Sequence, residues 1–107
     1  MTLDSFKRTT RQSAPPDELS PALTGLWWAA KGDWNRAHVL VQDDPSPDAA
    51  WVHAYLHRVE GDLGNANYWY RKAGRPASSD PLEAEWDAIA SALLSSTKSK
   101  GTKRGAG

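Results

Sequence analysis

The chain repeats one pattern as Gly32-Asp33-Trp34-Asn35-Arg36-Ala37 and, 29 residues later, as Gly61-Asp62-Leu63-Gly64-Asn65-Ala66. In both copies glycine is the residue that commonly ends a helix, and aspartate offers a carboxylate that can cap the next one. An apolar residue follows the aspartate, and an alanine three residues beyond it is small enough to let two helices approach closely. The repeat therefore predicts two helical hairpins.

Three helices are predicted to begin at Ser20-Pro21, Ser46-Pro47 and Asp80-Pro81. The first residue of each pair carries a side-chain oxygen suited to the N-cap, and the proline takes the first helical position, where its missing N–H costs no hydrogen bond. Apolar residues recur at helical spacing over residues 21–31 and 81–95. We expect both of these segments to be amphipathic helices.

The Gly-Asp turns begin two more helices, one from Asp33 to about Gln42 and one from Asp62 to Ala73. No segment alternates apolar and polar residues in the manner of a strand. We therefore expect an all-α fold of about five helices, in which two hairpins are completed by a C-terminal capping helix over residues 81–95.

The hairpin pattern resembles the tetratricopeptide and Sel1-like family of helical repeats, whose second helix commonly opens with Gly-Asp-aromatic-x-x-Ala. The likeness covers residues 21–76, and the two copies are spaced more closely than the about 34 residues of a standard tetratricopeptide unit. It implies a right-handed stack of hairpins with a concave groove that holds peptides. The core W-x-H-A-Y-L-H-R-x-E-G-D-x-x-N-A-x-Y-W-Y, which begins at Trp51, is also similar to small uncharacterised microbial proteins, a resemblance that implies no function.

Composition describes one small domain between two polar ends. The chain has 107 residues, of which 39% are hydrophobic and 24% charged, and it contains six tryptophans and no cysteine. We expect residues 19–95 to form a single domain. Residues 1–18 are expected to be disordered, and residues 96–107 to form a disordered basic tail.

Charge is segregated along the chain although the formal net charge is zero. The net charge is +2 over residues 1–16, −6 over residues 17–87 and +4 over residues 88–107. An acidic body repels phosphate, so the sequence speaks against nucleic acid as a partner of the folded part.

The sequence also indicates where in the cell the protein is expected and which interactions can stabilise its fold. No apolar run approaches the length of a membrane span, and the N-terminal residues lack the apolar stretch of a signal peptide, so we expect a cytoplasmic protein without a membrane partner. The absence of cysteine excludes disulfides and thiolate metal sites. So short a chain must be held by packing of its tryptophans or by assembly with copies of itself, which leaves a homo-oligomer open.

His53, His57 and Glu60 are the best candidates for chemistry, because their i, i+4, i+7 spacing stacks three potential ligands on one helix. Two histidines at i, i+4 can chelate zinc, iron or copper, and a carboxylate completes three ligands with one position open. His38 can join them from a neighbouring helix. In the other interpretation, the tetratricopeptide phase makes His53 and His57 interior histidines that are hydrogen-bonded to tyrosine, asparagine or backbone groups.

The same phase turns Trp51, Tyr55 and Arg58 toward the groove of the stack. Aromatic rings offer a large contact area at little cost in conformational entropy, and arginine can hold a carboxylate or phosphate through two parallel hydrogen bonds. These three residues equally suit packing against the preceding hairpin or the terminal helix. Further along, Tyr70 and Arg71 can share a polar pocket with His53.

No glycine-rich phosphate loop and no G-x-S-x-G elbow is present, so nucleotide-dependent and serine-hydrolase mechanisms have no support. The leading hypothesis is a binding module without a catalytic role or a cofactor. It recognises a peptide or a small anionic ligand through Trp51, Tyr55, Arg58, His53, His57, Tyr70 and Arg71. The alternative is a small metal-dependent enzyme or metal-binding protein that holds a transition metal such as zinc or iron with His53, His57 and Glu60.

Overall fold

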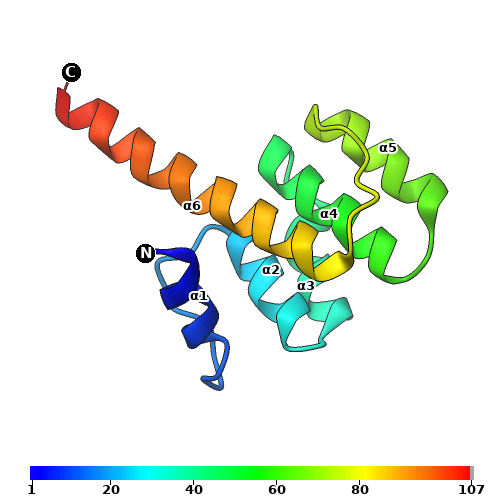
Figure 1. Ribbon diagram of the computed structural model, residues 1–107, viewed down its shortest axis with the longest axis horizontal. Helices are drawn as coiled ribbons and strands as arrows, with labels where there is room; N and C mark the ends of the chain where they lie inside the picture. Colours follow the sequence, from blue (N-terminus) through cyan, green and yellow to red (C-terminus); the bar gives the residue numbers. More distant parts are fainter. Residues whose placement is uncertain (107) are drawn as a thin grey trace.

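The computed structural model describes the backbone of residues 1–106 and the side chains of residues 1–96. This part of the chain consists of helices joined by turns and loops, without strands (Figure 1). The helices are α1 (Leu3–Thr9), α2 (Pro21–Ala30), α3 (Trp34–Gln42), α4 (Pro47–Val59), α5 (Leu63–Ala73) and α6 (Leu82–Ala106). The prediction of an all-α fold is confirmed, with six helices where about five were expected.

The predicted caps begin the four helices of the two hairpins. Ser20 and Ser46 each accept a hydrogen bond from the backbone N–H three residues ahead, and a proline follows in the first helical position. Asp33 and Asp62 accept the equivalent bond at the starts of α3 and α5. Each cap satisfies a backbone donor that the helix cannot pair internally, which is why these local signals locate the helix starts.

Gly32 and Gly61 make the tight turns inside the hairpins. Their φ angles are 82° and 85°, in the left-handed region that glycine occupies without steric cost. Gly25 serves a different purpose, because an added Cβ there would lie 3.1 Å from Val41 Cγ1. The absence of a side chain at this position lets α2 and α3 approach closely.

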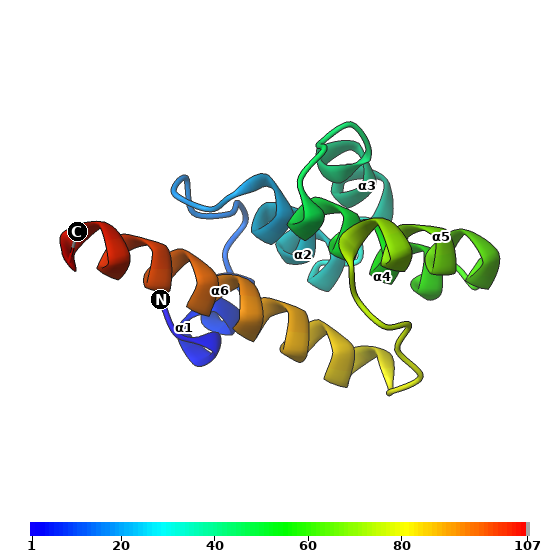
Figure 2. The same cartoon turned by 90° about the horizontal axis from the view of Figure 1, so that it is seen from above.

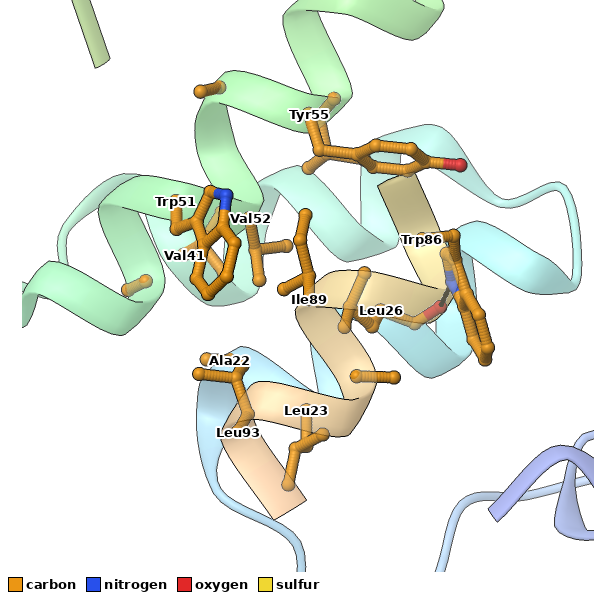
Figure 3. Close-up of a cluster of buried hydrophobic side chains, with 14 of the residues drawn as sticks. Ala22, Leu23, Leu26, Val41, Trp51, Val52, Tyr55, Trp86, Ile89 and Leu93 are labelled. Carbon is orange, nitrogen blue, oxygen red and sulfur yellow. Dashed lines mark hydrogen bonds between the residues drawn. The ribbon is translucent and has the colours of Figure 1, made fainter. Parts of the chain in front are cut away.

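The two hairpins, α2–α3 and α4–α5, are joined into one body because α3 packs against α4. α6 contacts both α2 and α4 and continues beyond the hairpins (Figure 1, Figure 2). In Figure 3, Ile89 of α6 lies between Leu26 of α2 and Val52 of α4, and Leu93 lies beside Ala22 and Leu23 of α2; all of these side chains are buried. The C-terminal helix therefore completes the core between the hairpins.

The N-terminal segment differs from the expectation of disorder over residues 1–18. Residues 3–9 form α1, and Phe6 is fully buried, stacked on Trp86 of α6 with ring centroids 5.5 Å apart. Trp27 donates its indole N–H to Thr9 Oγ1 at 3.1 Å, and Lys7 pairs with Asp87 at 2.9 Å. The fully buried aromatic residue of this segment thus packs against a residue in the C-terminal helix.

The C-terminal helix α6 extends from Leu82 to Ala106, past the predicted end near residue 95. The expectation that residues 96–107 form a disordered basic tail stays a prediction. Gly107 lies outside the described residues. Among the helices that the structure describes, none combines the length and the apolar composition that a membrane crossing requires.

Candidate functional site

All three histidines of the chain meet at the interface between α3 and α4. His38 comes from α3, whereas His53 and His57 lie one turn apart on α4. One ring nitrogen from each residue can be chosen so that the three atoms lie within 4.8 Å of one another. The Nε2 atoms of His38 and His53 are 3.0 Å apart. We refer to these three residues as the histidine cluster.

Trp34 holds His38 in place against α4. Its indole N–H donates to the backbone carbonyl of Leu56 at 2.7 Å, which ties the start of α3 to α4. Its ring stacks on that of His38, with centroids 4.7 Å apart and planes 11° from parallel. Trp34 is the aromatic residue of the first Gly-Asp repeat, so the turn that shapes the hairpin also positions one side of the cluster.

Trp69 of α5 covers the other side of the cluster. Its ring lies 3.9 Å from that of His53, nearly parallel to it, and His53 in turn stacks on His57 at 4.8 Å. His53 and His57 are buried, whereas His38, Trp34 and Trp69 are partly exposed. Side chains from three helices therefore hold the imidazoles at the edge of the core.

Glu60 orients His57. Its Oε1 lies 2.6 Å from His57 Nδ1. Because a carboxylate only accepts hydrogen bonds, Nδ1 of His57 carries a proton, which leaves Nε2 as the ring nitrogen that can serve as a metal ligand. A carboxylate bound to the far nitrogen of a histidine is the usual arrangement behind a metal-binding imidazole.

His53 has an unsatisfied ring nitrogen. Its Nδ1 is buried and has no hydrogen-bond partner within the described residues. Burial, followed by the neighbouring rings of His38 and His57, lowers the pKa of His53 to about 4. Burial also lowers the pKa of His38, helped by His57 and opposed by Glu60. Both rings are therefore neutral at neutral pH, which is the state that can donate a lone pair to a metal.

The structure changes the membership of the predicted metal set. His53 and His57 are brought together as their spacing indicated, but Glu60 pairs with His57 from outside the cluster and His38 stands as the third imidazole. The reason is the register of α3 against α4, which places His38 opposite His53. His57, Glu60 and Asp62 form a second close group, in which Asp62 already caps α5.

The predicted groove residues do not share one groove, because α6 packs against α4: Tyr55 borders a cleft near α1, and Trp51 borders a different hollow beside residues 75–80. Trp51 and Tyr55 are 9% and 7% exposed. Arg58 donates to the carboxylate of Glu85 at 2.6 Å and to the carbonyl of Asp80 at 2.7 Å. These contacts agree with the second interpretation of the three residues, packing against the terminal helix, and ligand recognition by them stays a prediction.

Tyr70 and Arg71, which were expected to accompany His53, point to different surroundings. Tyr70 is buried and donates its hydroxyl hydrogen bond to Glu85, and Arg71 is exposed on α5. Glu85 was missed by the sequence reasoning. A signal for it exists, because it falls three residues after Leu82 and four before Ile89, on the apolar side of α6.

No family model matches the sequence, and the searches for similar curated proteins and solved structures returned no match. The kind of ligand that the site can hold therefore follows from its side chains. Three imidazoles converge from two helices, one of them oriented by a carboxylate, and each can offer a ring nitrogen to a cation.

Proposed function

We propose that this protein binds a first-row transition metal ion through His38, His53 and His57. The convergence of one ring nitrogen from each of the three histidines within 4.8 Å carries the proposal. Glu60 supports the site from behind His57 and is not itself a ligand. His38 takes the place that the sequence assigned to Glu60 as third ligand.

The spacing of the imidazoles supports a shared ion. Zinc binds histidine nitrogen at roughly 2.0–2.1 Å, so two ligands of a tetrahedral site lie about 3.3 Å apart. The 3.0 Å between the Nε2 atoms of His38 and His53 is close to that value. A ring nitrogen of His57 lies within 4.8 Å of those of the other two histidines, so a movement of His57 toward them would complete three ligands.

A purely structural role fits these histidines less well. Interior histidines are normally hydrogen-bonded through both nitrogens to tyrosine, asparagine or backbone groups. Here the histidines contact one another and two tryptophans, and Nδ1 of His53 has no partner in the described part of the chain. An unpaired buried nitrogen costs stability, so His53 lacks the full set of hydrogen bonds that a purely structural histidine normally has.

The ligand atoms indicate the class of metal. Imidazole nitrogen suits zinc, copper, nickel, cobalt and iron, whereas magnesium and calcium prefer oxygen. Three protein ligands leave one coordination position for water or another small ligand. We therefore assign the protein to the transition-metal-binding class, with zinc as the first ion to test.

Metal analysis of the untagged protein tests the proposal. We expect near-stoichiometric binding of Zn²⁺, and a Co²⁺ titration that develops the strong visible absorption of a four-coordinate site. His38→Gln and His57→Gln should abolish both signals while far-ultraviolet circular dichroism stays helical. The control is Asn67→Gln, at an exposed position of α5, which should bind like the wild type. Stoichiometric binding that survives both histidine substitutions would overturn the assignment, and so would no saturable binding of either ion to the folded wild type.

A further inference from the structure

A second site is indicated by a cleft of about 500 Å³ between α1, the end of α2 and α6. It shares no residue with the histidine cluster. Its size lies toward the smaller end of the roughly 300–1,000 Å³ that small-molecule sites occupy. The lining residues that matter here are Lys7, Arg11, Tyr55, Glu83, Trp86 and Asp87.

The two walls of the cleft carry opposite charges. Lys7 and Arg11 contribute cations from α1 and the turn that follows it, and Glu83 and Asp87 contribute carboxylates from successive turns of α6. Lys7 and Asp87 are already paired at 2.9 Å. The charge of Glu83 acts on Lys7, but in the described part of the chain the side chains of Arg11 and Glu83 make neither an ion pair nor a hydrogen bond. A guanidinium and a carboxylate on opposite walls are therefore available to a ligand.

Tyr55 adds a polar group to a largely buried wall. The residue is 7% exposed and lines the cleft, and its hydroxyl end points away from the core toward the side where Trp86 lies (Figure 3). The hydroxyl makes no hydrogen bond to the described residues and is not among their buried unpaired atoms, so it can bond to a ligand in the cleft. Trp86 and Ala30 provide the apolar part of the lining.

We infer that this cleft binds a small zwitterion of the α-amino-acid type. The ligand carboxylate pairs with the fork of donors on Arg11, and its ammonium group pairs with Glu83. Its apolar side chain lies against Trp86. The Tyr55 hydroxyl forms a hydrogen bond, as donor or acceptor, with the carboxylate or ammonium group of the ligand. A ligand with only one of the two charges leaves the opposite wall unpaired.

Titration calorimetry with three matched probes tests the inference. L-Leucine carries both charges, 4-methylpentanoate lacks the ammonium group, and isoamylamine lacks the carboxylate. We expect saturable binding of leucine and about ten-fold or weaker binding of each single-charge probe, because each loses one charge-assisted pair. No saturation by leucine at tens of millimolar, or equal binding of all three probes, would overturn the inference.

Two substitutions separate this site from other ways of binding leucine. Arg11→Gln should weaken leucine about ten-fold and leave isoamylamine unchanged, and Glu83→Gln should weaken leucine to a similar degree and leave 4-methylpentanoate unchanged. Arg8→Gln, an exposed residue of α1 outside the cleft, is the matched control. Because amino acids also chelate metals, the titration is repeated with His57→Gln. Leucine binding that is lost in His57→Gln but kept in Arg11→Gln would place leucine on the histidine cluster. That outcome would contradict the assignment of leucine to the cleft.

Discussion

His38 and His53 face each other across the α3–α4 interface with their Nε2 atoms 3.0 Å apart. Both rings have a lowered pKa, so at neutral pH they meet as two uncharged imidazoles. A single proton between the two nitrogens makes one hydrogen bond, whereas a metal ion accepts both lone pairs together with that of His57. The predictions that concern the cluster depend on this relationship.

Metal binding should stabilise the fold, because the ligands come from different hairpins. An ion that binds only the folded state at 100 times its dissociation constant adds about 2.7 kcal/mol to the free energy of unfolding. For a domain of this size we expect Zn²⁺ to raise the Tm by roughly 10 °C. Thermal unfolding followed by circular dichroism with Zn²⁺ or with chelator measures the shift. His38→Gln should show none of it, and an equal shift in that variant would mean that the ion binds elsewhere.

Glu60→Gln should lower the metal affinity of the site without abolishing binding. The carboxylate fixes the proton on His57 Nδ1 and increases the basicity of the ring, and loss of such a partner typically costs about 10–100-fold in metal affinity. Competition against a chromophoric zinc chelator measures the change. Glu18→Gln, in the loop before α2, serves as the control. Complete loss of zinc from the folded Glu60→Gln protein would instead make Glu60 a direct ligand.

The fold was predictable where its signals are local. The Ser-Pro and Gly-Asp caps lie within three residues of the N–H groups they satisfy, so Ser20, Asp33, Ser46 and Asp62 were all found from the sequence. α1 was missed because its only buried side chain, Phe6, depends on Trp86 at the far end of the chain. Membership of the tetratricopeptide and Sel1-like family stays a prediction.

The candidate site was also predictable only where the signal is local in the sequence. His53 and His57 are on one helix, and the helical repeat alone brings them together. His38 depends on how two hairpins pack, so its spacing in the sequence carried no such information. Arg58 was assigned to a ligand because its true partner, Glu85, lies 27 positions further along the chain.

Arg58→Ala should destabilise the fold instead of merely removing a ligand contact. Glu85 is 3% exposed, and the Arg58 side chain that neutralises it is 14% exposed, so removing the guanidinium leaves a buried carboxylate without its cation. Loss of one partner from a buried pair costs about 3–5 kcal/mol. Urea unfolding measures the difference. Arg71→Ala, at an exposed position of α5, should stay within about 0.5 kcal/mol of the wild type. Equal stability of the two variants would show that the Arg58–Glu85 pair contributes nothing.

The raised pKa of Tyr70 leads us to expect a loss of stability at alkaline pH. Burial, followed by the hydrogen bond to Glu85 and the charge of that carboxylate, raises the pKa of Tyr70 above its ordinary value near 10, while Arg58 and the backbone of Ser78 oppose the shift. Below about pH 10 both folded and unfolded chains keep the phenol proton, so Tyr70 adds no pH dependence there. Above that pH the unfolded chain loses the proton first, and the free energy of unfolding should fall by about 1.4 kcal/mol per pH unit for this one group.

Tyr70→Phe removes that contribution and isolates it. The pKa of Tyr55 is also raised, chiefly by burial, so the variant should retain part of the alkaline slope. At pH 8 we expect Tyr70→Phe to be less stable than the wild type, because Glu85 loses one of its two side-chain donors. The difference between the two proteins should narrow as the pH rises above 10. Urea unfolding at pH 8, 10 and 11 measures this difference, and a gap that stays constant across the three values would mean that the Tyr70 proton is no more tightly held in the folded state than in the unfolded chain.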